Sequence, residues 1–376
     1  MSSNLRSLNE IISFRGGGTP KKDIAEYWSD EIPWASVKDF KSLDLSHTQD
    51  SISRKGLEES SANLIPAGHV IIPTRMALGK AAINSIDLAI NQDLRALIPK
   101  VPIDSRYLLH SMIGLAGEIE RYGSGATVKG ITQENLGKLQ IPLPPLDEQK
   151  RIAAILDAAD ALRAKRRQSI AQLDALIQST FLDLFGDPVT NPMGWEVKPL
   201  EELCSFLSGY AWKASAFNSD QKGNPVIRIQ NVGTQSTDFI FTTENPIDRF
   251  WIKRGDLLLS LSGSFRLAAW NGPPALLNQR IVKLTPQKSL SVSCFQAALS
   301  RQLGAIESMG RHALVNNVAL SDLKQVRLIL PPLPLQQKFA AIVESVERQK
   351  AAQRAHLAEL DTLFASLQHR AFRGEL

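Results

Sequence analysis

The sequence is poor in the residues and patterns that mark metal sites, disulfide-rich proteins and membrane proteins. Of its 376 residues only two are cysteines, Cys204 and Cys294, and neither has metal-ligand spacing around it. No window approaches the roughly 18–20 uninterrupted apolar residues of a membrane span. The segment "MSSNLRSLNEII" also lacks the basic start and apolar middle of a signal peptide. We therefore expect a cytoplasmic protein that binds no metal.

Signatures of common catalytic sites are missing as well. The Walker A, HExxH and GxSxG patterns do not occur. The strings nearest to the [ND]PP[YF] signature of methyltransferases are "NGPPAL" (271–276) and "NPMG" (191–194), and both lack an aromatic residue after paired prolines. The six histidines are scattered along the chain. We expect a non-catalytic protein that binds no cofactor of its own.

Length and charge set broad bounds on what the chain is. A chain of 376 residues is too long for one ordinary core, so two domains with connectors are expected. The hydrophobic fraction of 43% and the charged fraction of 22% are typical of a folded globular protein. The net charge of +5 permits a polyanionic partner without requiring one.

The sequence contains an internal repeat, which is clearest at two proline-rich segments. "LPPLDEQKRIAAIL" (143–156) and "LPPLPLQQKFAAIV" (330–343) match at eight of fourteen positions, 187 residues apart. The same offset aligns "NQDLRALIP" (91–99) with "NQRIVKLTP" (278–286) and 67–82 with 254–269. Further upstream the offset becomes 192, which we attribute to a five-residue difference in one surface loop. The chain is therefore two copies of one unit.

Each copy is expected to hold short strands, a short helix (105–123 in the first copy and 291–310 in the second), a proline elbow and then a long helix. In the first long helix, from about residue 147 to 185, apolar residues recur every three or four positions, and "GDP" at 186–188 ends it. A helix of about 38 residues is about 55 Å long. Because it cannot lie inside a globule of perhaps 140 residues, the two long helices are expected to form an antiparallel coiled coil. The predicted fold class is α+β, with two pseudo-symmetric globular domains joined by these helices.

These residues resemble the specificity subunit of a type I DNA restriction–modification system. The segments that carry the resemblance are "GGGTPKKDIAEYWSDEIPWASVKDF" (16–40), the two "NQ" segments, "IPLPPLDEQKRIAAILDAAD" (141–160) and the closing "LQHRAFRGEL" (367–376). The resemblance covers essentially the full length, in order and in both copies. It implies two target-recognition domains, at 1–143 and 187–330, and two conserved long-helix regions, at 144–186 and 331–376.

The resemblance also implies the partners. Each recognition domain would read one half of a bipartite double-stranded DNA target. Two methyltransferase subunits using S-adenosylmethionine, and restriction/translocase subunits using ATP and Mg, would assemble on the chain. The alternatives are a coiled-coil scaffold that binds only proteins, or the specificity subunit of a related type II-like methyltransferase/nuclease. The scaffold would leave the duplicated globules and the positive charge without a purpose.

Candidate DNA contacts follow from residue type. The segment "RGGGTPKK" (15–22) is either a turn with solvated lysines or a DNA-backbone contact, since glycine N–H groups and lysines suit an anion. Arginine and lysine pair with guanine, and asparagine and glutamine pair with adenine. The candidates are Thr19, Lys21, Lys22, Lys38, Asp39, Arg75 and Lys80 in the first domain, and Arg228, Gln230, Asn231, Ser262, Ser264 and Arg266 in the second. The recurrent Asn91/Gln92 and Asn278/Gln279 are expected to be structural, because recognition residues should differ between the domains.

Basic residues also cluster halfway along each long helix. They are Arg163, Arg166 and Arg167 in the first helix, and Arg348, Lys350 and Arg354 in the second. Antiparallel pairing would bring both clusters to the stretch between the recognition domains, where they would neutralise phosphates of the unread DNA spacer. A solvated helix face and a docking face for the methyltransferase are the alternatives. Helices of about 55 Å would limit the separation of the half-sites to roughly 16 base pairs.

Overall fold

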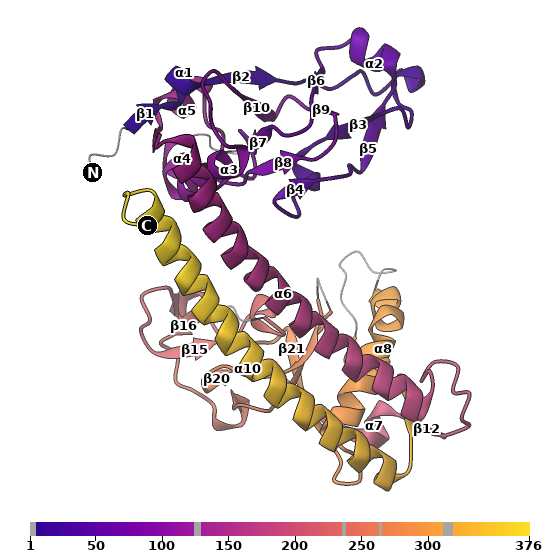
Figure 1. Ribbon diagram of the computed structural model, residues 1–376. Helices are drawn as coiled ribbons and strands as arrows, with labels where there is room; N and C mark the ends of the chain where they lie inside the picture. The colour runs from indigo at the N-terminus through magenta and orange to yellow at the C-terminus, as the bar shows by residue number, and fades with distance from the viewer. Residues whose placement is uncertain (1–4, 124–128, 235–237, 263–264, 311–318) are drawn as a thin grey trace. The chain divides into compact units, whose positions relative to one another are not determined.

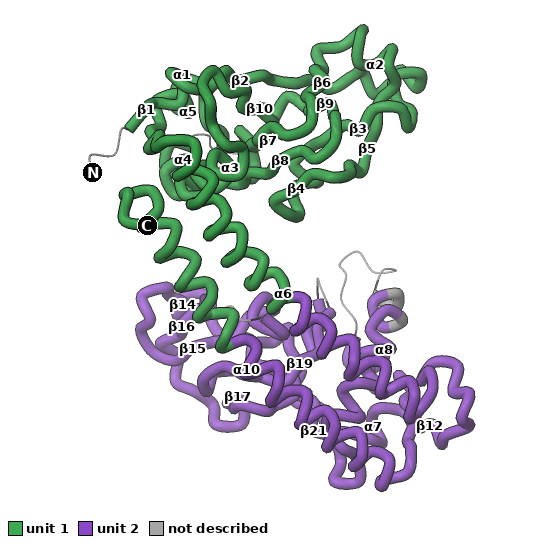
Figure 2. Tube along the Cα trace, in the orientation of Figure 1, with its two compact units in different colours: residues 1–167, 355–376 green, residues 168–354 purple. Residues whose placement is uncertain are grey.

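The chain forms two compact units that share the two long helices (Figures 1 and 2). The computed structural model describes residues 5–123, 129–234, 238–262, 265–310 and 319–376. Unit 1 combines residues 1–167 with 355–376, and unit 2 comprises residues 168–354. The chain passes between the units within α6 (Leu146–Phe185) and within α10 (Leu333–Ala371). None of the helices in the described ranges is long and apolar enough to cross a membrane.

Unit 1 contains three sheets, and short helices flank its strands. Its elements before α6 are β1 (Leu5–Ser7), α1 (Leu8–Ile11), β2 (Ile12–Gly16), η1 (Ala25–Tyr27), β3 (Ile32–Ala35), η2 (Val37–Asp39), β4 (Asp44–Leu45), β5 (Asp50–Ile52), α2 (Arg54–Glu58), β6 (Asn63–Ile65), β7 (Val70–Pro73), β8 (Ala82–Asn84), β9 (Leu88–Ile90), β10 (Leu94–Pro99), α3 (Ser105–Gly114), α4 (Ala116–Tyr122), α5 (Gln133–Lys138) and β11 (Gln140–Pro142). The sheets have the strand orders β2-β10-β7-β8-β4, β5-β3-β9-β6 and β1-β11. Buried aliphatic residues of β7, β10, α1 and α3 form the main core of the unit.

Unit 2 has the same plan. Its elements between the long helices are β12 (Glu196–Pro199), α7 (Leu200–Leu203), β13 (Cys204–Ser208), η3 (Ala214–Ala216), β14 (Phe217–Asn218), β15 (Asn224–Val226), η4 (Ile229–Asn231), β16 (Ile240–Thr242), η5 (Asp248–Phe250), β17 (Trp251–Ile252), β18 (Leu257–Ser260), β19 (Leu267–Ala269), β20 (Ala275–Leu276), β21 (Ile281–Pro286), α8 (Val292–Gly310), α9 (Leu320–Gln325) and β22 (Arg327–Leu330). The sheets are ordered β13-β21-β18-β19, β14-β16-β15-β20-β17 and β12-β22.

The repeat seen in the sequence is confirmed element by element. An offset of 187 carries β7 onto β18, β10 onto β21 and α5 onto α9, and an offset of 192 carries α1 onto α7 and β2 onto β13. Strand pairing is repeated as well. Trp34 of β3 is the parallel neighbour of Ala89 of β9, and their counterparts, Val226 of β15 and Leu276 of β20, are parallel neighbours too. The offset changes between η2 and β6. That segment is not a plain loop, because in unit 1 it carries β4, β5 and α2.

The long helices pair antiparallel within each unit, as expected. In unit 1, Arg151 of α6 contacts Leu376 just beyond α10, while Arg163 contacts Asp361. In unit 2, the Phe181 and Phe185 rings of α6 pack on Phe339 of α10, with ring centroids 5.6 Å away. Position numbers therefore rise along one helix as they fall along the other. Figure 1 shows the two helices side by side.

The proline elbow is held by one buried glutamine in each unit. Gln149 donates from Nε2 to the Pro144 carbonyl at 2.9 Å, and its Oε1 accepts the backbone N–H of Asp104 at 2.9 Å. Gln336 makes the equivalent bonds to Pro331 and Ser291, at 2.7 and 2.9 Å. Each glutamine is 1% exposed. The amide therefore ties the start of the long helix to the start of α3 or α8.

Candidate nucleic-acid interface

The glycine-rich segment at 15–22 is a packed turn rather than a loose one. The N–H of Gly18 donates to the Ile90 carbonyl at 3.0 Å, and the Gly18 carbonyl accepts the indole N–H of Trp34 at 3.0 Å. A Cβ on Gly17 would lie 1.8 Å from the Ile90 oxygen, so only glycine fits there. These glycines serve the fold, which supports the turn interpretation for them. Lys21 and Lys22, at the end of the turn, are exposed.

A polar network joins this turn to the end of β7. The Thr19 hydroxyl donates to Gln92 Oε1, and Gln92 Nε2 donates to Asp93 Oδ2 at 3.4 Å. Asp93 in turn lies 3.8 Å from the guanidinium of Arg75. The structure thus links Thr19 to Arg75 through Gln92 and Asp93. The structural role predicted for Asn91 is supported by its side-chain oxygen, which accepts the Asp93 N–H at 3.0 Å.

Lys38, Asp39 and Lys80 lie close together but differ in what they expose. The Asp39 carboxylate accepts the N–H groups of Ser36 and Gln49, at 2.8 and 2.9 Å, and thereby shapes the turn at η2. Lys80 Nζ donates to the Phe40 carbonyl at 3.2 Å, which holds the loop after β7 against that turn. Lys38 is exposed. The two lysines therefore offer positive charge, whereas the Asp39 carboxylate is already hydrogen-bonded to backbone N–H groups.

In unit 2 the equivalent turn, η4, is built around Asp238. Arg228 donates from Nη2 to the Asp238 carboxylate at 2.8 Å, and Gln230 donates to the same carboxylate at 3.3 Å. Asn231 is only 1% exposed: its Oδ1 accepts the Arg228 N–H and its Nδ2 donates to the Asp238 carbonyl. The structure brings Arg228 and Gln230 together at the surface, and it buries Asn231 beneath them.

The loop after β18 holds the other candidates of unit 2. Ser262 is 5% exposed, and its hydroxyl is buried without a hydrogen-bond partner in the described ranges. Arg266 is half-buried, and its N–H donates to the Ser260 hydroxyl at 2.8 Å. Ser264 lies outside the described residues. Exposed Arg280, which matches Asp93 at the 187 offset, is a cation of this region that the sequence interpretation missed.

The basic clusters of the long helices are largely neutralised by carboxylates. In unit 1, Arg163 contacts Asp160 and Asp361, and Arg167 also reaches Asp361 at 3.1 Å. In unit 2, Lys350 contacts Asp174 at 2.6 Å as well as Glu347, which lies 3.9 Å from Arg354. Arg166, half-buried, is not without a partner. Helix pairing uses Arg163, Arg167 and Lys350, which leaves less positive charge for a DNA spacer.

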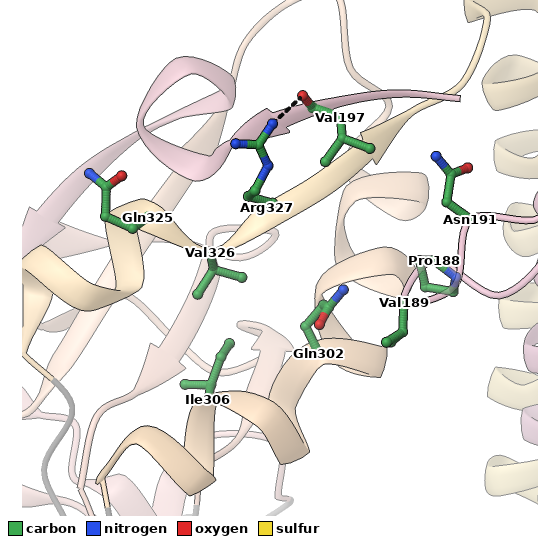
Figure 3. A pocket seen from close by; sticks show the side chains of 9 residues that line it. All are labelled: Pro188, Val189, Asn191, Val197, Gln302, Ile306, Gln325, Val326 and Arg327. Carbon is green, nitrogen blue, oxygen red and sulfur yellow. Dashed lines mark hydrogen bonds between the residues drawn. The ribbon is translucent and has the colours of Figure 1, made fainter. Parts of the chain in front are cut away.

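A pocket of about 410 Å³ lies in unit 2 between β12, β22, α8 and the segment after α6 (Figure 3). Arg327 crosses one side of it and donates to the Val197 carbonyl at 3.4 Å. Apart from Arg327 its lining is aliphatic and amide, with no carboxylate, imidazole or thiol among the lining residues. The side chains around it therefore offer no acid–base or nucleophilic group.

Reactive cysteines and metal-ligand clusters do not emerge from the described part of the chain. Cys204 and Cys294 are buried, and burial raises the pKa of each thiol to about 12, which keeps both protonated. No group of three His, Cys, Asp or Glu residues in the described ranges is arranged to hold a metal ion.

Comparison with known proteins agrees with the resemblance. The model of the type I restriction modification DNA specificity domain matches twice, at residues 3–174 and 192–362. The type I restriction enzyme MjaIX specificity subunit of Methanocaldococcus jannaschii is 25% identical over 91% of this chain and 86% of that protein. The EcoR124I/EcoR124II specificity subunit of Escherichia coli is 37% identical, over 42% of this chain and 41% of its own.

The fold also matches a solved structure. The type I restriction–modification S subunit from M. genitalium superposes with a TM-score of 0.57 at 16% identity, covering 98% of this chain and 96% of that one. This likeness supports the fold alone. The matched domain model occupies most of the chain and occurs once in each half, so neither the scaffold nor the type II-like alternative is favoured. The chain belongs to the family of type I restriction–modification DNA specificity subunits, whose members select the target and leave catalysis to other subunits.

Proposed function

We propose that this chain binds a bipartite double-stranded DNA target and brings two methyltransferase subunits, and with them restriction/translocase subunits, to that target in the cytoplasm. The chain would bind no cofactor, while S-adenosylmethionine, ATP and Mg would serve the partner subunits. Residues 1–143 and 187–330 would each read one half-site. The long-helix regions, 144–186 and 331–376, would hold these two domains.

The observation that carries this proposal is that one scaffold appears twice with different surface side chains. The strands before the two loops end at matching residues, Pro73 and Ser260. Beyond them the copies diverge: Arg75 and Lys80 of the first half match Ser262 and Leu267 of the second. A scaffold that is kept while its loop chemistry changes is what reading two different half-sites requires.

The DNA contacts that we propose are the exposed or half-buried members of the candidate set. They are Thr19, Lys21, Lys22, Lys38, Arg75 and Lys80 in the first domain, and Arg228, Gln230 and Arg266 in the second. Lysine and arginine would contact phosphates, and Gln230 and the arginines would suit base edges. We leave out Asp39, Asn231 and Ser262 because backbone or burial occupies them. We also leave out the cations of the long helices, because Arg163, Arg167 and Lys350 bind carboxylates of the opposite helix. Arg228 is kept because its partner, Asp238, is itself an exposed residue near the same turn.

The experiment that tests this function is a methylome of cells that express the chain with its methyltransferase partners, with and without this gene. A bipartite methylated motif that disappears with the gene is expected. Arg75→Ala should then relax or weaken one half of the motif, and Arg266→Ala the other half. Lys338→Ala, at an exposed position of α10 outside the candidate set, is the control and should change neither half. Loss of both half-sites in a single variant would contradict independent readers.

A further inference from the structure

Met76, in the loop after β7, exposes more of its side chain than any other large apolar residue in the described ranges. Its relative exposure is 64%, whereas the aliphatic residues of the preceding strand are 0–1% exposed. Exposing a thioether side chain forfeits the free energy of its burial. An exposed apolar group beside a binding surface is therefore a candidate contact.

The backbone of Met76 is also in an unfavourable conformation. Its φ is +64°, in the left-handed region that favours glycine. Among described non-glycine residues only Asn191 and Gln221 share a positive φ, and asparagine tolerates it well. In the sequence of the second half the matching position is Gly263, the residue expected for this conformation. The first half therefore carries methionine where the backbone alone would favour glycine.

Hydrogen bonds hold this loop in place. The Met76 N–H donates to the Lys129 carbonyl at 3.3 Å, and the Ala77 N–H donates to the Arg75 carbonyl at 2.8 Å. The Lys80 N–H donates to the Ala77 carbonyl at 3.3 Å, which closes the turn. The side chain of Met76 is thus presented from an ordered backbone, which suits a contact of defined geometry.

The surroundings of Met76 are basic. Residues 74–80, "TRMALGK", contain two cations and no acid, and both Arg75 and Lys80 are exposed. An acidic polymer fits such a loop better than a neutral protein surface does. On double-stranded DNA the apolar group presented in the major groove is the C5-methyl of thymine. Methionine, flexible and polarizable, packs well on such a group.

We infer that Met76 is a specificity-determining residue that contacts the C5-methyl group of a thymine in the half-site read by the first domain. This inference rests on the proposed function. It adds an apolar contact to the polar ones of Arg75 and Lys80. The strained backbone and the exposed side chain of Met76 then have a single explanation, because both serve a contact that forms only when DNA is bound.

The test uses the complex purified with its methyltransferase subunits and duplexes carrying the motif found by the methylome. Each thymine of the first half-site is replaced in turn by deoxyuridine, which lacks only the C5-methyl. The wild-type complex should bind one of these duplexes about three- to fourfold more weakly, the effect of one buried methyl-sized group. Met76→Gly should bind the thymine and deoxyuridine duplexes equally at that position.

Two further variants guard against misinterpretation. Met76→Asn lacks the thioether but adopts positive φ readily, so it serves if the glycine variant folds poorly. Met193→Ala removes another exposed methionine, 54% exposed in the segment after α6, and should keep the wild-type sensitivity. The inference is overturned if the Met76 variants remain as sensitive to deoxyuridine as the wild type, or if the half-site holds no thymine on either strand. A wild-type complex that methylates no bipartite motif would instead overturn the proposed function itself.

Discussion

The guanidinium of Arg163 bridges to Asp361 across the two long helices, with Nε 2.6 Å from Oδ1. The same guanidinium contacts Asp160 three residues earlier at 2.8 Å and lies over the Phe364 ring, 4.3 Å from its centroid. At the 187 offset, Lys350 of unit 2 repeats this arrangement with Glu347 and Asp174. A cation fixed between an acid of its own helix and an acid of the other helix sets the register of the pair.

Reversing the charge of Arg163 should therefore weaken unit 1. In Arg163→Asp three carboxylates would face one another, and the half-buried site would screen them only partly. We expect the free energy of unfolding to fall by about 1–3 kcal/mol, between the values for exposed and buried pairs. Urea titration followed by circular dichroism measures this change.

The control is a charge reversal at a residue for which no ion pair is found within the described ranges. Arg348→Asp makes the same charge change at an exposed site of α10 and should cost less than about 0.5 kcal/mol. The double variant Arg163→Asp/Asp361→Arg should recover much of the lost stability. A double variant no more stable than the single one would show that the bridge does not set the register.

A second prediction concerns Gln149, the buried glutamine of the first proline elbow. Gln149→Met keeps the size of the buried side chain but leaves the half-buried Pro144 carbonyl and Asp104 N–H without their partner. Each unsatisfied group should cost about 1–3 kcal/mol. The thermal unfolding midpoint of the variant should fall accordingly.

Gln149→Glu separates the two bonds of this clamp. An ionised glutamate can still accept from Asp104 but cannot donate to Pro144, whereas a protonated one can do both. The Glu variant should therefore recover stability, relative to wild type, as the pH falls from 7 to 5. A Glu variant as stable as the wild type at pH 7 would contradict the donor role of Nε2.

We expect His110 to make the stability of unit 1 depend on pH. It is 0% exposed on α3, and its Nε2 lies 2.7 Å from Asp157 Oδ1 of α6. Burial lowers the pKa of His110, and the hydrogen bond to Asp157 opposes this shift while the charge of Arg106 adds to it. A group whose folded-state pKa lies below its unfolded value binds more protons when unfolded. Stability contributed at this site is therefore present above the unfolded pKa, about 6.5, and declines as the pH falls below it.

Urea unfolding at pH 7.5 and at pH 5.5 tests whether stability falls as the pH is lowered. The wild type should lose stability over that interval by up to about 1.4 kcal/mol per pH unit. His110→Phe, which has no proton to bind, should lose less. Equal losses in the two proteins would assign the pH dependence to other groups.

The architecture could be predicted well from the sequence because the two copies of the repeat can be aligned, and an element inferred in one copy can be tested against the other. The long helix expected from about residue 147 to 185 spans Leu146–Phe185, and the antiparallel pairing is confirmed. The spacing of apolar residues and the Gly-Asp-Pro segment that ends the helix are local signals, so they can be recognised without tertiary information. The helix expected over 105–123 is instead split at Leu115 into α3 and α4.

The sites were less predictable because they depend on which side chains meet across elements. The cations at Arg163 and Lys350 look free in the sequence, yet each is paired with an aspartate on the other long helix. A signal did exist: an acid precedes each cation by three residues in both copies, at Asp160 and Glu347. The burial of Asn231 and the exposure of Met76 leave no comparable trace in the local sequence.

The sharing of the long helices between units has a consequence for synthesis of the chain. Unit 1 packs Ile152, Leu156 and Ala159 against Phe364 and Ala371, which follow all of unit 2 in the chain and are therefore synthesised after it. Tyr107 of α3 packs in the same cluster, but the part of α6 that Phe364 and Ala371 cover stays exposed until all of unit 2 has been made. Nascent chains would need protection from aggregation during that interval, and a stop codon near residue 355 would damage the first half of the protein rather than the second.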